Sequence, residues 1–68
     1  DVVQLPKLTR REKHVLSLIA AGKRTNDIAE ELYISPLTVE THRRNLMQKL
    51  KVSNAAAMVR FAMENGLI

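Results

Sequence analysis

The sequence has no cysteine and no tryptophan, and its 68 residues include only two glycines, two prolines and two aromatic residues. Without cysteine, neither disulfides nor thiolate metal sites can hold the fold together. No apolar run approaches the roughly 20 residues that span a bilayer, and the amino terminus lacks the charged-then-apolar pattern of a signal peptide. We therefore expect a cytoplasmic protein without membrane contact, which depends on helix packing and helix caps for its stability.

Apolar and basic residues are plentiful. Hydrophobic residues make up 46% of the chain, which rules out wholesale disorder and indicates one small globular domain. A domain of this length buries only about 60% of its unfolded surface, so its core must be simple. Lysine and arginine outnumber aspartate and glutamate by 11 to 7, giving a formal net charge of +4. This excess favours an anionic partner, with nucleic acid ahead of a membrane surface.

Helix signals recur along the chain, and no stretch alternates as a strand would. Residues 1–7 contain a proline and are predicted to be a linker, whereas residues 8–68 are predicted to be one domain. Thr9 and Glu12 have the spacing of a capping box, in which each side chain accepts from the other residue's backbone N–H. The helix that follows ends at Gly22, because glycine readily adopts the left-handed conformation of a helix end.

Three further helices are predicted from the same kinds of signal. Thr25 is expected to cap the second helix, and Ser35 the third, whose first residue is Pro36. Ser53 is expected to begin the fourth helix, which runs to about Asn65. The predicted fold class is therefore all-α: a compact four-helix bundle with connections of only a few residues.

Thr25–Leu50 has the organisation of a helix-turn-helix. Two short helices are joined by about three residues, Tyr33–Ser35. Ala29 lies where the helices should cross, and only a small side chain there allows them to approach closely. The second helix of this motif lies in the major groove of DNA. Pro36–Leu50 is therefore the predicted recognition helix.

The outward face of Pro36–Leu50 is found by counting 100° per residue. With Val39, Leu46 and Leu50 pointing inward, the outward residues are Leu37, Glu40, Thr41, Arg44 and Gln48, and the flanking ones are His42 and Arg43. Arginine pairs with guanine, glutamate accepts from cytosine, and threonine contacts polar base edges or a thymine methyl. Glu40, Thr41 and Arg44 are the predicted base readers. The alternative is a polar face that is merely solvated.

Phosphate contacts are expected at helix amino termini, where unpaired N–H groups and the helix dipole attract anions. Basic residues on the recognition helix should add to them, because residues 37–51 hold four bases against one acid. The predicted phosphate-binding residues are Lys23, Thr25, Asn26, Ser35, Thr38, His42, Arg43 and Lys49. For the residues at helix starts, plain capping is an equally good interpretation.

The fourth predicted helix is more apolar than one buried face requires. One side gathers Ala55, Met58, Val59, Ala62 and Met63, and the other carries Ala57 and Phe61. An exposed aromatic on a small domain suggests contact with a second copy. Ala57 and Phe61 are therefore predicted to lie in a dimer interface. Alternatively, Phe61 packs against the end of the first helix.

Catalysis is not indicated by any group of residues. His14 and His42 fall on different helices with no evident carboxylate partner, and neither a glycine-rich phosphate loop nor a nucleophile motif occurs. Zinc would lack a second ligand at helical spacing. We expect no enzymatic activity, no metal and no cofactor.

Many of these positions, taken together, resemble one family. They are Thr9–Glu12, Val15, Leu16, Gly22, Thr25, Asn26, Ile28, Ala29, Leu32, Ile34, Ser35, Thr38, Val39, His42, Leu46, Lys49, Leu50, Val52 and Ser53. The sequence is similar to the LuxR-type helix-turn-helix domain of NarL/FixJ response regulators and quorum-sensing regulators. The resemblance implies a bacterial transcription regulator that binds double-stranded DNA as a homodimer, with a receiver or ligand-binding domain amino-terminal to this chain.

The resemblance also implies base contacts from Glu40, Thr41 and Arg44. Glu40 departs from the lysine usual in the NarL-like pattern, so the preferred DNA sequence should differ from that of lysine-bearing relatives. Tyr33 stands where helix-turn-helix motifs often have glycine. Two alternatives are a sigma-factor-like promoter-reading domain, which shares the motif but not the fourth helix, and an adaptor bundle that binds only protein.

Overall fold

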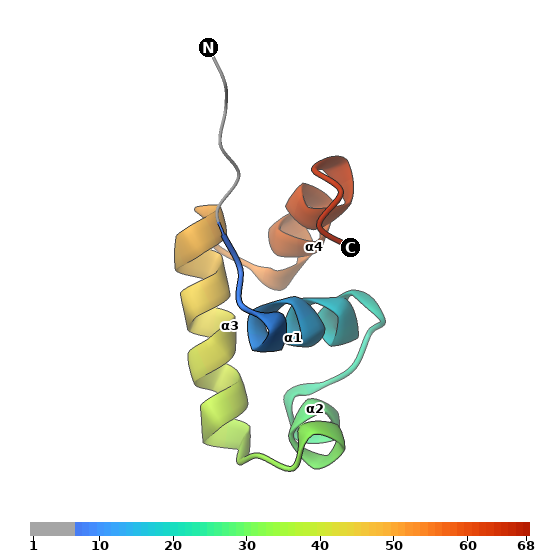
Figure 1. Cartoon of the computed structure of the whole chain (residues 1–68), viewed down its shortest axis with the longest axis vertical. Coiled ribbons are helices and arrows are strands. Elements are labelled where there is room, and N and C mark those ends of the chain that lie inside the picture. Colours follow the sequence, from blue (N-terminus) through green and yellow to red (C-terminus); the bar gives the residue numbers. More distant parts are fainter. Residues whose placement is uncertain (1–6) are drawn as a thin grey trace.

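Four helices make up the regular structure of residues 7–68, the part of the chain that the computed structural model describes. They are α1 (Arg10–Ala20), α2 (Thr25–Leu32), α3 (Pro36–Leu50) and α4 (Ala55–Glu64). These residues contain no strand, so the predicted all-α four-helix fold is confirmed (Figure 1). Of the predicted linker, residues 1–6 lie outside the described part of the chain. Lys7 is exposed, and the buried residues begin at Leu8.

Short-range hydrogen bonds set the ends of α1 and the start of α3 where the sequence predicted them. The Thr9 N–H donates to Glu12 Oε1 over 2.9 Å and the Glu12 N–H donates to Thr9 Oγ1 over 3.1 Å, which completes the capping box. Beyond α1, Gly22 has a φ of 87°. At α3, Ser35 Oγ accepts from the Thr38 N–H over 3.1 Å, and a proline follows as the first helical residue.

Two predicted helix starts were wrong, by one residue at α2 and by two at α4, which begins at Ala55 and not at Ser53. Thr25 is the first residue of α2 and not its cap, because Arg24 holds the cap position and donates its backbone N–H to the first-turn carboxylate of α2. The cap of α4 is Asn54 rather than Ser53, and its Oδ1 accepts from the Ala57 N–H over 2.8 Å. At α2 the correction matters for function, since it releases the Thr25 hydroxyl for contacts with α3.

The residues that follow α2 and α3 are both left-handed, and neither is glycine. Tyr33 has a φ of 56° and Lys51 a φ of 55°. This conformation costs roughly 1–2 kcal/mol for an ordinary residue. Packing of the Tyr33 side chain does little to offset this cost, because the residue is 94% exposed. The turn is held instead by backbone hydrogen bonds, including the one that Ile34 donates to the Ala29 carbonyl over 3.0 Å.

The core lies between α3 and the other three helices, each of which packs against it. Its buried apolar residues are Leu8, Val15, Leu16, Ile28, Ala29, Val39, Leu46, Leu50, Met58 and Ala62. The predicted inward face of the recognition helix is therefore confirmed, as is the burial of small Ala29 between α2 and its neighbours. Met63 was grouped with the inward side of α4 and that is wrong, because it is 66% exposed near the end of the helix.

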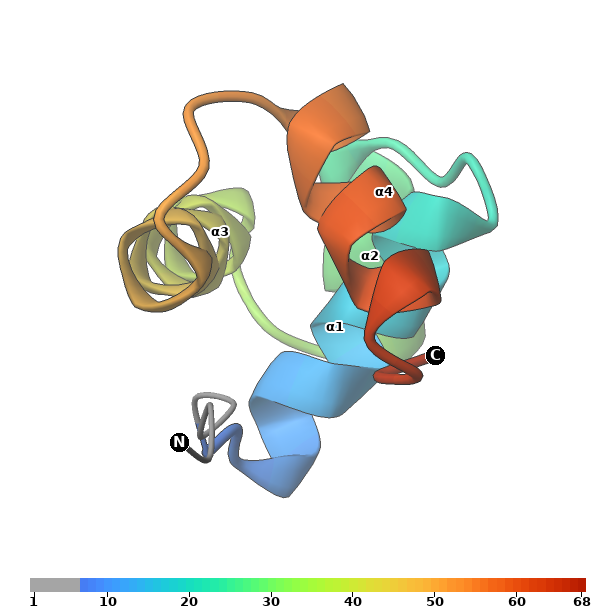
Figure 2. The ribbon, with the colours of Figure 1, turned by 90° about the horizontal axis from the view of Figure 1, so that it is seen from above.

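The arrangement leaves one long face of α3 uncovered. Viewed along α3, helices α1, α2 and α4 all lie on one side of it (Figure 2). In Figure 1 the same helix runs along the edge of the molecule for its full length. None of the four helices is both long enough and apolar enough to cross a membrane.

Candidate nucleic-acid interface

The uncovered face of α3 consists of the residues that the helical periodicity placed there. They are Leu37, Glu40, Thr41, Arg44 and Gln48, and all five are exposed. The Thr41 hydroxyl donates to the Leu37 carbonyl over 3.1 Å, so its proton is held within the helix. Leu37 is 75% exposed, which is unusual for a leucine in so small a domain. The face thus offers a guanidinium, an amide and an apolar side chain to a ligand that approaches α3 from outside.

Glu40 differs from the rest of this face because its carboxylate already has partners. The Thr25 hydroxyl, at the start of α2, donates to Glu40 Oε1 over 2.7 Å. Arg43 Nη1 lies 3.8 Å from the same oxygen and donates to Thr25 Oγ1 over 3.0 Å. The three side chains form a polar cluster, here called the α2–α3 cluster, that ties the two helices of the motif together.

The predicted flanking residues, His42 and Arg43, are both half-buried. The Arg43 side chain is 25% exposed, and its Nε is buried without a hydrogen-bond partner among the described residues. A guanidinium with an unsatisfied buried nitrogen is costly, so its place in the α2–α3 cluster must be favourable overall. Arg43 therefore has a packing role in addition to any contact with a ligand.

The predicted phosphate-binding residues at helix starts fall into two groups. Ser35 and Thr38 are engaged with each other, since their hydroxyl oxygens lie 2.9 Å apart and Ser35 also caps α3. Lys23 and Asn26 are exposed beside the first turn of α2. Thr25 belongs to neither group, because its hydroxyl is hydrogen-bonded to Glu40 on α3. The first turns of α2 and α3 still present backbone N–H groups, as every helix start does.

Lys49, another predicted phosphate ligand, has an intramolecular partner. Its Nζ donates to Glu12 Oε1 over 2.6 Å, and the Glu12 side chain is only 6% exposed. Burial by itself would raise the pKa of the Glu12 carboxyl, but the hydrogen bonds from Lys49 and Thr9 together outweigh it and hold the pKa below its ordinary value of 4.5. Glu12 is thus charged in the folded protein and joins the start of α1 to the last turn of α3.

Neither polar contact between helices could be predicted from the sequence. Glu12 had a complete local explanation as half of a capping box, and Lys49 lies 37 positions further along the chain. Thr25 likewise had a local explanation as a cap, and its partner Glu40 is 15 positions away. In each case the residue already had a role in a local motif, and its partner lies on another helix. The sequence could pair the two only if the crossing of the helices were known.

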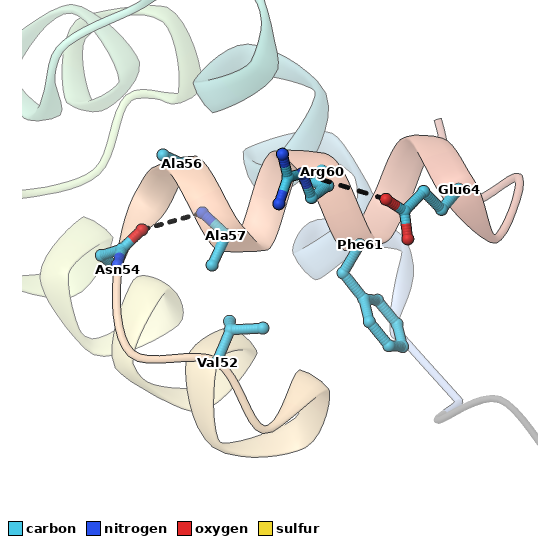
Figure 3. Close-up of a pocket in the computed structure, with 7 residues that line it drawn as sticks. All are labelled: Val52, Asn54, Ala56, Ala57, Arg60, Phe61 and Glu64. Carbon is cyan, nitrogen blue, oxygen red and sulfur yellow. Dashed lines mark hydrogen bonds and ion pairs between the residues drawn. The ribbon is translucent and has the colours of Figure 1, made fainter.

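The outer side of α4 lines an open groove of about 600 Å³. Its lining residues are Val52, Asn54, Ala56, Ala57, Arg60, Phe61 and Glu64 (Figure 3). Figure 3 shows the Phe61 ring on the same side of α4 as Ala57, both facing Val52. Phe61 is half-buried and packs against the core, so it is less exposed than the sequence suggested. The groove has an apolar floor and a charged rim formed by Arg60 and Glu64, which lie 3.9 Å apart.

The two histidines remain on separate helices. His14 was expected to lack a carboxylate partner, and this is wrong, because its Nε2 lies 3.8 Å from Glu31 Oε2. Both side chains of that pair are about half exposed, so the contact is a weak surface one. Across residues 7–68 there is no group of three or more histidine, aspartate or glutamate side chains placed to hold a metal ion.

Comparison with known proteins assigns the fold to a family. The family model described as bacterial regulatory proteins, luxR family, matches residues 6–62. The chain belongs to the luxR family. This membership confirms the LuxR-type domain expected from the sequence, which is a DNA-binding domain of transcription regulators.

Relatives of this luxR-family domain are regulatory proteins of greater length. The transcriptional regulatory protein MctR of Rhizobium johnstonii is 44% identical over 61 residues, which cover 90% of this chain and 28% of MctR. The probable transcriptional regulatory protein NarL of Mycobacterium tuberculosis is 48% identical over 63 residues, covering 93% of this chain and 29% of NarL. The domain therefore spans less than a third of the length of each of these two relatives.

A solved structure shares the fold of the luxR-family domain along almost its whole length. The VqmA–ligand–DNA complex of Vibrio cholera aligns with a TM-score of 0.87 at 31% identity, over 98% of this chain and 29% of VqmA. The alignment spans all four helices and their three connections, so the order and crossing of the helices match those of that protein.

Proposed function

We propose that this luxR-family domain binds double-stranded DNA with sequence preference, by placing α3 in the major groove. The observation that carries the proposal is the long, mostly polar face of α3 that the rest of the fold leaves uncovered (Figure 2). The major groove is about 12 Å wide and admits one α-helix. Support also comes from VqmA, a similar protein whose structure was solved in complex with DNA.

Base reading is proposed for the exposed polar residues in the middle of α3. Arg44 would donate to a guanine edge, and Thr41 would contact a base through its hydroxyl oxygen or its methyl group. Glu40 was predicted to act with them, but its carboxylate already accepts a hydrogen bond from the Thr25 hydroxyl. Phosphate binding is proposed for Lys23, Thr25, Asn26, Ser35, Thr38, His42 and Arg43. For Lys49 the salt bridge to Glu12 favours a structural role over the predicted phosphate contact.

The salt dependence of binding to random-sequence duplex tests this function. Basic residues that neutralise phosphates release counterions, so the affinity should fall linearly on a log–log plot of affinity against salt. If about six phosphates are contacted, the loss between 50 and 200 mM salt is about 10³-fold. Fluorescence anisotropy with a labelled 30-base-pair duplex measures it. A domain that binds only protein would leave the anisotropy unchanged at the lowest salt concentration, and that result would refute the proposal.

Within a longer regulator, the domain is proposed to be the carboxy-terminal effector module of a response regulator in the cytoplasm. The support is that MctR and NarL, which it resembles, are more than three times its length. Residues 1–7 would then be the linker from a receiver or ligand-binding domain, and residues 8–68 the DNA-binding domain. The receiver or ligand-binding domain would be the second partner, besides DNA.

A second copy of the domain is the proposed occupant of the groove on α4. Ala57 and Phe61 form its apolar floor, and the charged rim suits a symmetric contact in which Arg60 of one copy meets Glu64 of the other. We expect Phe61→Arg to reduce the occupancy of a duplex with two half-sites from two domains to one. Sedimentation velocity on a duplex with two copies of a sequence selected from a random pool measures the stoichiometry.

Two further variants separate the interface from folding. Met63→Arg introduces the same charge on a different side of α4, where the residue is already exposed, and should leave two domains bound. Ala57→Arg crowds the groove without removing the core contacts of Phe61 and should behave like Phe61→Arg. If the wild-type domain binds the two-site duplex with strictly one copy, the dimer interface is refuted.

A further inference from the structure

Glu40 lies to one side of the outward face and is directed toward the start of α2. At 100° per residue, Leu37, Arg44 and Gln48 fall along nearly one line of α3, and Glu40 is displaced from it by about 60°. The displacement is toward the side that carries Arg43, which is half-buried against α2. Its carboxylate therefore meets the Thr25 hydroxyl, at 2.7 Å, instead of projecting straight outward.

The α2–α3 cluster uses the donors that a DNA phosphate would need at this place. A threonine hydroxyl has one proton to donate, and that of Thr25 is given to Glu40. Arg43 Nη1 is directed to the same two residues, 3.0 Å from Thr25 Oγ1 and 3.8 Å from Glu40 Oε1. A carboxylate and a phosphate are both anions that accept charge-assisted hydrogen bonds from such groups. The Glu40 carboxylate thus has the negative charge, the hydrogen bond from Thr25 and the nearby Arg43 guanidinium that a bound phosphate oxygen would have there.

Exposure shows that this carboxylate is accessible to a competing anion. The Glu40 side chain is 50% exposed, whereas the Arg43 side chain is 25% exposed. Water and a phosphate can reach the carboxylate from outside, while the guanidinium is held between the helices. Because the donors on Thr25 and Arg43 are held in place and the Glu40 acceptor is exposed, a phosphate oxygen can replace the carboxylate without repacking the core.

We propose that Glu40 is a positioning residue that occupies, on Thr25 and Arg43, the place of a DNA backbone phosphate. This inference rests on the proposed DNA binding. It assigns Glu40 a role that does not depend on sequence, in place of the predicted reading of a cytosine. Every duplex, whatever its sequence, must displace the carboxylate from Thr25 or approach the domain without that contact. Glu40 therefore lowers the affinity for all DNA and leaves the choice of base to Thr41 and Arg44.

Removal of the carboxylate tests the proposal through general affinity, salt dependence and base preference together. Glu40→Ala should bind random-sequence duplex about threefold to tenfold more tightly than wild type at low salt, because Thr25 and Arg43 become available to a phosphate. The log–log salt slope should steepen by about 0.9, the value for one added phosphate contact. Glu40→Gln, which keeps an acceptor oxygen but loses the charge, should show a smaller gain.

The control is Glu30→Ala, which removes the same charge from an exposed position on α2 and should leave the slope unchanged. Thr25→Val in the Glu40→Ala background should abolish most of the gain, since the hydroxyl that would bind the phosphate is then absent. Circular dichroism melting of each variant establishes that the binding changes occur in folded protein.

The opposite pattern would overturn the proposal. If Glu40→Ala and Glu40→Gln change the preference at one base pair while binding random duplex like Glu30→Ala, Glu40 reads a base. If Glu40→Ala gains affinity but the gain survives Thr25→Val, the carboxylate does not act through the cluster and the proposal is wrong. If the wild-type domain binds no duplex at all, the proposed function itself is refuted, which is a different result from either of these.

Discussion

Replacing Lys49 with methionine is expected to lower the free energy of unfolding by about 2 kcal/mol. The substitution keeps most of the apolar stem and removes only the amine that donates to Glu12 over 2.6 Å. The Glu12 carboxylate would then be left charged at 6% exposure with only the hydrogen bonds of its own capping box. Removing one partner of a fully buried pair costs about 3–5 kcal/mol. The smaller value is expected because the Lys49 side chain is 38% exposed.

A loss of this size is large for this domain. A single core of fewer than about 70 residues rarely supplies more than about 3–5 kcal/mol of net stability. Urea denaturation followed by circular dichroism measures the change, and Lys13→Met is the control, because Lys13 is exposed on α1. If Lys49→Met melts like Lys13→Met and instead weakens binding to all DNA, then Lys49 is a phosphate ligand as the sequence predicted.

The pH dependence of stability provides a second check on the same pair. Folding lowers the pKa of Glu12, so the charged carboxylate contributes stability that is fully present above its unfolded pKa, near 4.5. That contribution is lost as the pH falls through the lower pKa of the folded state. The stability difference between wild type and Lys49→Met should therefore shrink as the pH is lowered below 4.5. A difference that stays constant into strong acid would show that the charge on Glu12 is not what Lys49 stabilises.

Replacing Arg44 with alanine is expected to cost about 1–3 kcal/mol of discrimination at one base pair of the preferred site. Arg44 lies in the middle of the uncovered face of α3, is exposed and has no ion pair or side-chain hydrogen bond among the described contacts. Its planar guanidinium matches the two acceptors of guanine, which is the commonest specific contact in the major groove. Binding to a panel of duplexes with single base-pair changes measures the loss position by position.

Arg11→Ala is the matched control, since it removes the same charge from an exposed position on α1. It should weaken binding to every duplex slightly and equally. Arg44→Lys should retain part of the affinity but lose discrimination, because an ammonium group cannot make the same paired contact. Should Arg44→Ala reduce binding to all members of the panel by one common factor, α3 would be rotated differently in the groove from the orientation proposed.

Local chemistry made the helices predictable from the sequence. Thr9 and Glu12, or Ser35 with the proline after it, specify a helix start within four residues, and both starts were predicted correctly. The inward and outward faces of α3 followed from its periodicity alone. At α4 the sequence offers two adjacent side chains able to cap, Ser53 and Asn54, and local chemistry does not decide between them.

Contacts between helices could not be predicted from the sequence. Periodicity shows which face of a helix is buried but not which residue of another helix lies opposite, because that depends on how the two helices cross. Glu40 could be placed on the outer side of α3 without any indication that Thr25 would reach it. Phe61 was expected to be exposed on α4, yet it is half-buried because it packs against the core, a contact that the periodicity of α4 alone does not show.

The salt bridge between Glu12 and Lys49 has a thermodynamic consequence for anion binding at the end of α3. One amine cannot serve a buried carboxylate and a DNA phosphate at once, so an anion that took Lys49 would weaken the first turn of α1. Such antagonism is reciprocal: whatever strengthens the first turn of α1 must disfavour that anion by the same factor. The salt bridge therefore links the stability of the first turn of α1 to anion binding at the last turn of α3, across 37 positions of sequence.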